Sequence, residues 1–201
     1  LGECVMGTVR FGAFAQFVTV RAEDIFPLPA DFDFATGAAF LVAYKTAYVG
    51  LVVRGDLKAG ETVLVHGAAG GVGLAAVELA KTLGARVIGM ASGTRKLAAV
   101  LDKGADYVLD YKDGSFREVV KELTGGLGAD VIYDPIGGDV FDESLHCIAP
   151  FGRLLVIGFA SGRIPELAVN YALLKQCAIV GVRAGEYGRV NRDGGQEVNR
   201  V

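Results

Sequence analysis

The segment Val63–Ala80 decides the fold of this chain, and it reads Val-Leu-Val-His-Gly-Ala-Ala-Gly-Gly-Val-Gly-Leu-Ala-Ala-Val-Glu-Leu-Ala. A β-branched run, a glycine turn and apolar residues at helical spacing predict a buried strand, a tight turn and a helix. Gly70 would let a pyrophosphate approach the backbone, Gly73 would let the helix pack on the strand, and the helix start offers free N–H groups. The segment therefore predicts a dinucleotide site, the alternative being a tight turn with a structural role only.

Strand and helix patterns continue to alternate after this segment. The predicted strands are 62–66, 86–90, 107–109, 130–133 and 153–157, and the predicted helices are 71–83, 93–102, 115–123 and 138–147. Repeated alternation with short crossovers is typical of a parallel sheet covered on both faces. The fold class is therefore α/β, with a Rossmann-type doubly wound parallel sheet.

The first 53 residues follow a different pattern. Residues 11–30 alternate like a half-buried strand and end at two prolines, and Asp31 and Asp33 precede a helical region that runs to about Val53. The stretch Ala35–Val53 is apolar except for small polar groups and Lys45 at its centre. Because a charge at mid-span is costly in lipid, we expect no membrane insertion but a helix wedged between two domains.

Composition favours a small-molecule partner. The 201 residues carry a net charge of -3 with a pI near 5.4, which gives no electrostatic reason to expect nucleic acid or an anionic membrane surface. Cys4, Cys147 and Cys177 lie too far apart in sequence for a paired metal motif. We expect them to be small buried hydrophobic residues in a reducing, cytoplasmic compartment.

The loop after the second predicted strand indicates which dinucleotide binds. An acid about 20 residues after the glycine turn would bind the ribose hydroxyl of NAD, but no Asp or Glu occurs between Glu78 and Asp102. The loop instead contains Ser92, Arg95 and Lys96, which suit a 2′-phosphate. We therefore predict NADPH as the cofactor, the alternative being that the two cations only form a solvated helix face.

Two more glycine-rich loops follow predicted strands, at Tyr133–Asp139 and Val156–Gly162. Ligands of doubly wound sheets bind at the carboxyl ends of the strands, where these loops would lie beside the glycine turn. Together with Gly67–Gly73 and Gly104–Asp106, these motifs resemble the zinc-independent quinone oxidoreductase branch of the medium-chain dehydrogenase/reductase superfamily.

The resemblance implies a domain arrangement and a reaction. Residues 1–30 would be a remnant of a GroES-like β-barrel substrate domain, 31–183 the Rossmann NADP(H)-binding domain, and 184–201 the start of the return to the barrel. Because members of the branch begin with roughly a hundred residues of barrel, we expect this chain to be a piece of a longer enzyme. That enzyme would pass a hydride from NADPH to a quinone or an activated alkene such as an enone.

The resemblance also implies cofactor contacts. Those to the phosphates would be made at Ala69, Gly70, Gly71 and Val72, those to the 2′-phosphate at Ser92, Lys96 and Tyr111, and those to the nicotinamide end at Thr46, Gly158 and Phe159. No catalytic residue is assigned. Arg183 is a candidate for steering an electron-rich carbonyl oxygen, the alternative being a surface or subunit-contact arginine.

The zinc enzymes of the superfamily carry a cysteine ligand where this chain has Val42. Valine has no donor atom, so we expect no zinc. His66 fits a packed or cofactor-adjacent residue better than a ligand, and His146, in the helix predicted over 138–147, has only Cys147 as a metal-capable neighbour.

Two other function classes stay open, namely a non-catalytic NADPH-binding protein and an enoyl reductase module of a fatty-acid or polyketide synthase. The apolar run 177–182 predicts a last strand at the sheet edge. In the resembling family the equivalent strand pairs with its twin, so we expect a homodimer.

Overall fold

The computed structural model describes residues 1–191, 194 and 198. Its centre is a six-stranded parallel sheet in the order β5-β4-β3-β6-β7-β8, as in a doubly wound Rossmann-type fold. The strands are β3 (Thr62–Val65), β4 (Arg86–Ala91), β5 (Tyr107–Asp110), β6 (Ala129–Asp134), β7 (Ile148–Val156) and β8 (Ala178–Gly181). The predicted fold class is therefore confirmed.

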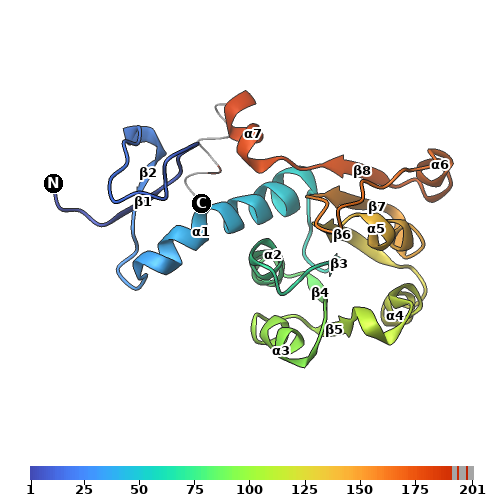
Figure 1. The fold of residues 1–201 in the computed structure, drawn as a ribbon. Coiled ribbons are helices and arrows are strands. Elements are labelled where there is room, and N and C mark those ends of the chain that lie inside the picture. Colours follow the sequence, from blue (N-terminus) through green and yellow to red (C-terminus); the bar gives the residue numbers. More distant parts are fainter. Residues whose placement is uncertain (192–193, 195–197, 199–201) are drawn as a thin grey trace.

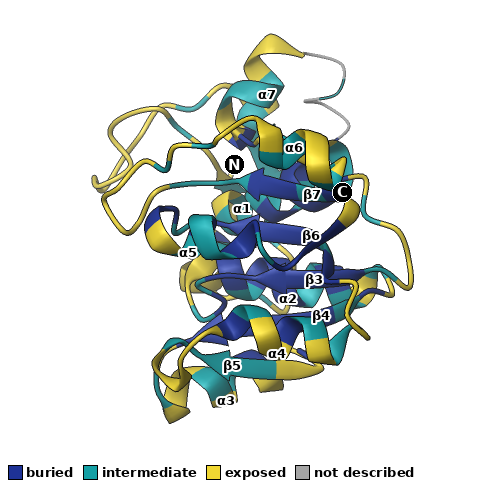
Figure 2. Ribbon diagram, turned by 90° about the vertical axis from the view of Figure 1, so that its right-hand side faces the viewer, coloured by how far each residue is buried: buried dark blue, intermediate teal, exposed yellow. Residues whose placement is uncertain are grey.

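Helices cover both faces of this sheet (Figure 1). They are α1 (Phe34–Tyr48), α2 (Gly71–Thr82), α3 (Thr94–Asp102), α4 (Phe116–Leu123), α5 (Gly138–Ser144), α6 (Asn170–Lys175) and α7 (Ala184–Val190). Alternate residues of each buried strand point to opposite faces, which divides the core into two layers. In β3, Val63 and Val65 pack with α1 and α2, whereas Leu64 packs with α4 and α5. Figure 2 shows the buried sheet between these partly exposed helices.

The helix α1 is long because a π-helical segment, Val49–Arg54, continues it. Asp33 caps its start by accepting a hydrogen bond from the Thr36 N–H. Phe34–Arg54 is long and apolar enough to cross a membrane on length and composition alone. In the structure α1 packs against α2, where the Tyr44 hydroxyl donates to Glu78, and it also contacts the short strand β1 (Val5–Gly7) and α7.

The strands β1 (Val5–Gly7) and β2 (Ile25–Pro27) form a small antiparallel pair beside α1, away from the parallel sheet (Figure 1). The prediction of a strand along residues 11–30 is wrong for most of that range, since only 25–27 are in a strand. Residues 11–20 have no partner strand in the described part of the chain to accept their backbone hydrogen bonds. The side chains of Phe11, Phe14 and Phe17 are exposed.

Most bounds of the predicted strands and helices after residue 60 agree with the structure to within one residue, and two differ by more. The helix predicted over 138–147 ends at Ser144, so His146 lies in the turn that follows, where its N–H donates to the Glu143 carbonyl. The strand predicted over 153–157 begins five residues earlier, at Ile148, and contains Pro150 and Phe151. Phe151 has a φ of 63°, which lies in the left-handed region, so the strand is irregular at this residue. A pattern with a period of two residues does not predict such an irregularity.

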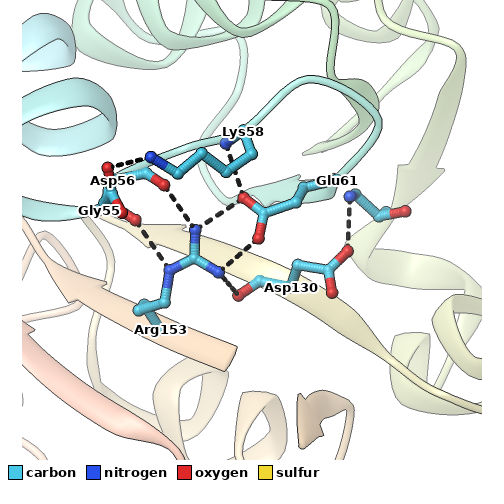
Figure 3. Close-up of polar contacts among 7 residues, drawn as sticks. Gly55, Asp56, Lys58, Glu61, Asp130 and Arg153 are labelled. Carbon is cyan, nitrogen blue, oxygen red and sulfur yellow. Dashed lines mark hydrogen bonds and ion pairs between the residues drawn. The ribbon is translucent and has the colours of Figure 1, made fainter. Parts of the chain in front are cut away.

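Arg153 ties the loops before β3 to the sheet at the amino ends of the strands (Figure 3). Its guanidinium donates to both carboxylate oxygens of Glu61, at 2.8 and 2.7 Å, and to the Gly55 carbonyl oxygen at 2.8 Å. The Asp130 carboxylate accepts from the Thr62 N–H in the same cluster. This end of the sheet is therefore fixed by a half-buried ion pair, and it lies opposite the glycine turn.

Candidate functional site

The glycine turn connects β3 to α2 with the geometry that an anion site needs. Gly70 precedes α2 without a side-chain cap, and the first N–H groups of a helix have no acceptor inside the helix. Gly70 and Gly71 are exposed, and a Cβ atom at Gly71 would meet nothing within 4 Å. The turn therefore offers open N–H groups and the positive end of α2 to a pyrophosphate, at the positions where the contacts of Ala69, Gly70, Gly71 and Val72 are predicted.

Gly73 has the packing role expected from the sequence. A Cβ atom there would overlap the Gly67 carbonyl oxygen and lie 2.8 Å from the Ala68 Cα atom. Gly67 has a φ of 55°, which starts the turn in the left-handed region. The helix can approach the turn this closely only because position 73 has no side chain. Ala69 and Val72 are half-buried beside it.

The other two glycine-rich loops lie beside this turn at the carboxyl edge of the sheet. The N–H groups of Ala160 and Ser161 donate to the carbonyl oxygens of Pro135 and Ile136, at 3.1 and 3.0 Å. A Cβ atom at Gly67 would lie 3.0 Å from the Ile136 side chain. The three loops therefore form one continuous edge, which includes Gly158 and the exposed Phe159.

The loop after β4 carries the predicted 2′-phosphate residues. Ser92, Arg95 and Lys96 are exposed at the start of α3, and a Cβ atom at Gly93 would meet nothing within 4 Å. The loop also has a carboxylate beside it that the sequence pattern did not predict, because this carboxylate comes from the neighbouring strand β5. Asp110 pairs with Ala91 across the sheet, and its Oδ2 accepts from the Gly93 N–H at 2.8 Å. Its only sequence signal is its place at the end of the neighbouring strand.

Tyr111 lies behind the glycine turn. The Gly67 N–H donates to the Tyr111 hydroxyl oxygen at 2.9 Å, and that hydroxyl lies 3.3 Å from the Nδ1 atom of His66. His66 is fully buried, as expected for a packed residue, and its Nε2 atom lies 2.8 Å from the Ser144 hydroxyl. Burial lowers the pKa of His66 to about 3, so its ring is neutral.

Thr46 and Arg183 lie together in a separate cavity of about 1120 Å³ between α1, α7 and residues 8–21. The Thr46 hydroxyl donates to the Val42 carbonyl oxygen at 2.6 Å, which leaves its oxygen able to accept. Arg183 is exposed, and the nearby Glu186 carboxylate is paired with Arg189. The cavity has a net basic character, because its lining contains five cations against two carboxylates, namely Arg10, Arg21, Lys45, Arg183 and Arg189 against Asp24 and Glu186.

The cysteines meet the expectation in part. Cys147 is buried, and burial raises the pKa of its thiol to about 12. Cys177 is half-buried, but Cys4 is exposed, so the expectation of burial is wrong for Cys4. Among residues 1–191, 194 and 198, no three His, Cys, Asp or Glu side chains are grouped to hold a metal ion.

Glycine-rich loops at the carboxyl edge of a doubly wound sheet are the arrangement typical of a dinucleotide-binding domain. A family profile described as zinc-binding dehydrogenase matches residues 71–195. The quinone oxidoreductase-like protein 2 homolog of Nematostella vectensis is 42% identical over 190 residues, which cover 94% of this chain and 51% of that protein. The chain belongs to the quinone oxidoreductase-like family of the medium-chain dehydrogenase/reductase superfamily, as the sequence motifs indicated.

Solved structures agree with this assignment. A probable oxidoreductase from Mycobacterium abscessus superposes with a TM-score of 0.85 at 39% identity, covering 99% of this chain and 59% of that one. A mycobacterial protein in complex with NADPH gives a TM-score of 0.87 at 35% identity, covering 94% of this chain and 58% of that one.

A highly reducing polyketide synthase of Aureobasidium melanogenum is 39% identical over 163 residues, which are 80% of this chain and 7% of that protein. The chain spans about half the length of the quinone oxidoreductase-like relatives that it matches.

Proposed function

We propose that the protein containing this chain is an NADPH-dependent oxidoreductase that transfers a hydride to a quinone or an activated alkene without zinc. The observation that carries the proposal is the open, uncapped start of α2 at the edge where three glycine-rich loops meet. The likeness to a mycobacterial protein in complex with NADPH supports the same cofactor.

The residues present fit a dinucleotide. The N–H groups at Gly71 and Val72 would hold the pyrophosphate, and Ser92 with Lys96 would hold the 2′-phosphate in the open space beside Gly93. Bound NADPH would supply the hydride. The chain contributes mainly by positioning, since the loop with Phe159 lies at the same edge and Arg183 presents an exposed guanidinium to a carbonyl oxygen.

The side chain at the position of the expected zinc ligand supports the proposal of a reaction without zinc. Val42 stands where the resemblance places a zinc ligand, and a valine side chain has no lone pair. We expect elemental analysis of the purified protein to find less than stoichiometric zinc and chelation to leave its activity unchanged. Stoichiometric zinc would overturn this part of the proposal.

Cofactor choice provides the first test. We expect NADPH to bind at least about tenfold tighter than NADH, which is roughly 1.4 kcal/mol, in fluorescence titrations of the chain. Arg95 and Lys96 must supply this preference against the nearby Asp110 carboxylate, so Lys96→Ala should weaken NADPH and leave NADH nearly unchanged. Equal affinities for the two dinucleotides in the unmodified chain would overturn the predicted preference.

Turnover provides the second test. This chain should bind NADPH but reduce quinones far more slowly than the full-length parent, because an open cleft neither orients the acceptor nor excludes water. Comparable kcat/KM values for the chain and the parent would show that the substrate site does not depend on the part of the parent outside this chain, contrary to the proposal. A parent that binds NADPH and reduces no acceptor would indicate a non-catalytic binding protein.

The similarity to a polyketide synthase favours one alternative, an enoyl reductase module within a longer polypeptide. The length of the parent and its activity on a thioester-linked alkene, compared with a free quinone, distinguish the two functions.

A further inference from the structure

The cavity between α1, α7 and residues 8–21 carries an excess of positive charge. Among the described residues, its lining holds five cations and two carboxylates. Each carboxylate already accepts a hydrogen bond from an arginine of the same lining, at 2.8 and 3.0 Å, in the pairs Arg21–Asp24 and Arg189–Glu186. Five cations against two carboxylates leave three positive charges in excess around the cavity. Arg10 and Arg183 contribute to this excess and are exposed, so an incoming group can reach their N–H donors.

Arg183 lies at the edge of the sheet where the dinucleotide is proposed to bind. β7 and β8 are parallel neighbours, and the Val182 N–H donates to the Val156 carbonyl oxygen at 3.0 Å. Arg183 therefore leaves the sheet beside the glycine-rich loop 156–162. The helix α7 follows Arg183 and contacts α1, and Thr46 of α1 lines the same cavity (Figure 1).

This position is too far from the proposed phosphate contacts to serve them. The glycine turn follows β3 and the loop with Ser92 follows β4, whereas Arg183 follows β8. In the sheet order β3-β6-β7-β8, three strand spacings separate the glycine turn from Arg183, which amounts to about 14 Å. A pyrophosphate at the start of α2 would therefore leave the cations at the end of β8 to the other reactant, the hydride acceptor.

The amount of charge indicates what kind of acceptor fits. One guanidinium is enough for a neutral carbonyl oxygen, whereas several cations around one cavity favour a group with a full negative charge. The volume of about 1120 Å³ exceeds the range of about 300 to 1000 Å³ that is usual for small-molecule sites, so there is room for more than the reacting carbons. A carboxylate conjugated to the reacting double bond would disfavour hydride addition, so the charge belongs on a remote part of the acceptor.

We propose that the hydride acceptor of the parent protein is an activated alkene with a carboxylate on a remote tail, and that Arg183, together with Arg10, binds this carboxylate and determines the preference for it. This inference rests on the proposed function. The reduction adds a hydride from NADPH to one carbon of the double bond and a proton from water to the other, which leaves NADP⁺ and an unchanged carboxylate. Arg183 suits this role because a planar guanidinium binds a carboxylate through two parallel hydrogen bonds.

A matched pair of acceptors tests the proposal in the parent protein. The pair is an open-chain enone whose saturated tail ends in a carboxylate, and the primary amide of the same acid. We expect kcat/KM to be at least about tenfold higher for the carboxylate, as one charge-assisted hydrogen bond provides, and this ratio to fall as salt is added. Equal kcat/KM values for the two enones would overturn the proposal.

Substitutions assign the preference to residues of the cavity. Arg183→Gln should lower the ratio of the two kcat/KM values at least about fivefold. Arg86→Gln is the matched control, because it removes a positive charge at the amino end of β4, where Arg86 stacks on Tyr107, and it should leave the ratio unchanged. Arg10→Gln, at an exposed position, should also lower the ratio and takes the place of Arg183→Gln if that variant does not fold. An unchanged ratio in the cavity variants, or an equal decrease in Arg86→Gln, would overturn the proposal.

Binding measured without a cofactor separates this inference from the proposed function. The saturated keto acid formed from the carboxylate enone should shift the backbone N–H NMR signals of Thr46 and Arg183 in the unmodified chain, and its amide should not. If the parent reduces no acceptor, the proposed function fails, while this titration still decides whether the cavity binds a carboxylate. The absence of shifts with the keto acid would overturn the inference.

The affinity for NADPH distinguishes an acceptor site from a cofactor site. Arg183→Gln should weaken the keto acid more than it weakens NADPH, because the phosphates are expected at the glycine turn and the loop with Ser92. A loss of NADPH affinity as large as the loss of keto-acid affinity would assign the charge to the cofactor and overturn the proposal.

Discussion

At the scale of single residues, the polar side chains outside the nucleotide edge hold the fold together. Arg153 makes a two-pronged contact with Glu61 and also binds backbone carbonyl groups of the loop before β3 (Figure 3). Its side chain is 18% exposed, so solvent screens the pair less than it screens the ion pairs at the surface. The planar guanidinium fits this arrangement, and an ammonium group cannot reproduce it.

Arg153→Lys should therefore lower the free energy of unfolding by about 1 to 3 kcal/mol, because several hydrogen bonds are lost together. Arg117→Lys is the control, since Arg117 pairs with Glu118 and Glu143 in a more exposed position. Urea unfolding of the three proteins measures the difference. An equal effect of the two substitutions would show that the Arg153 cluster adds nothing beyond a surface pair.

His66 makes stability depend on pH. Its pKa is about 3 in the folded chain and 6.5 in the unfolded chain, so the unfolded chain binds the additional proton. The stability from the neutral ring is complete above about pH 6.5 and falls by about 1.4 kcal/mol per pH unit below it, toward pH 3.

The comparison of the unmodified chain with His66→Gln between pH 7 and pH 5 tests this dependence. The glutamine variant should show a shallower slope in this window. Asp134 is also buried, and its raised pKa acts in the opposite direction, but it contributes to both proteins and cancels in the difference. Identical slopes would contradict the assignment to His66.

At the scale of elements, the start of α2 decides both packing and binding. Gly73 lies against the backbone of Gly67 and Ala68, whereas Gly71, two residues earlier, faces open space. The same change to alanine therefore has opposite consequences at two neighbouring glycines.

Gly73→Ala should destabilise the chain by about 2 kcal/mol or more, because the added methyl group must displace backbone. Gly71→Ala should leave the thermal midpoint unchanged or raise it slightly, since alanine favours a helix. Calorimetry of both variants measures the contrast. A stable Gly73→Ala protein would mean that the helix does not approach the turn as closely as the structure indicates.

At the scale of the whole molecule, the sheet ends in a strand, β8, whose outer edge has no partner strand among the residues that the structure describes. β8 is the edge of the sheet next to β7, as the apolar run 177–182 predicted, and Leu173 and Leu174 of α6, the helix that precedes β8 in the chain, are exposed. An apolar edge of this kind invites pairing with a second chain.

We expect a homodimer in which β8 pairs antiparallel with its copy, visible by light scattering at tens of micromolar protein. Ala178→Lys should shift the mass toward the monomer by placing a charge on the edge, and Leu127→Lys, at an exposed site on the α4–β6 loop, should not. A monomeric unmodified chain would count against the predicted pairing.

The sequence by itself determined the features that depend on local spacing. The glycine turn, the alternation of strands and helices and the two later glycine loops are readable because each needs only neighbouring residues and the periods of 2 and 3.6. The turn at Gly67–Gly73 and the helix α2 were predicted within one residue of the observed bounds. The family followed from the same motifs.

Only the tertiary structure decided which distant groups meet. Asp110 contacts Gly93, Tyr111 contacts His66 and Arg153 contacts Glu61, and the partners in these pairs are 17, 45 and 92 residues apart in the sequence. Such pairs depend on strand order and register, which a single sequence does not encode locally. The strand predicted over residues 11–30 is absent from 11–20 for the same reason, because alternation predicts a face but a strand forms only where a partner satisfies its backbone.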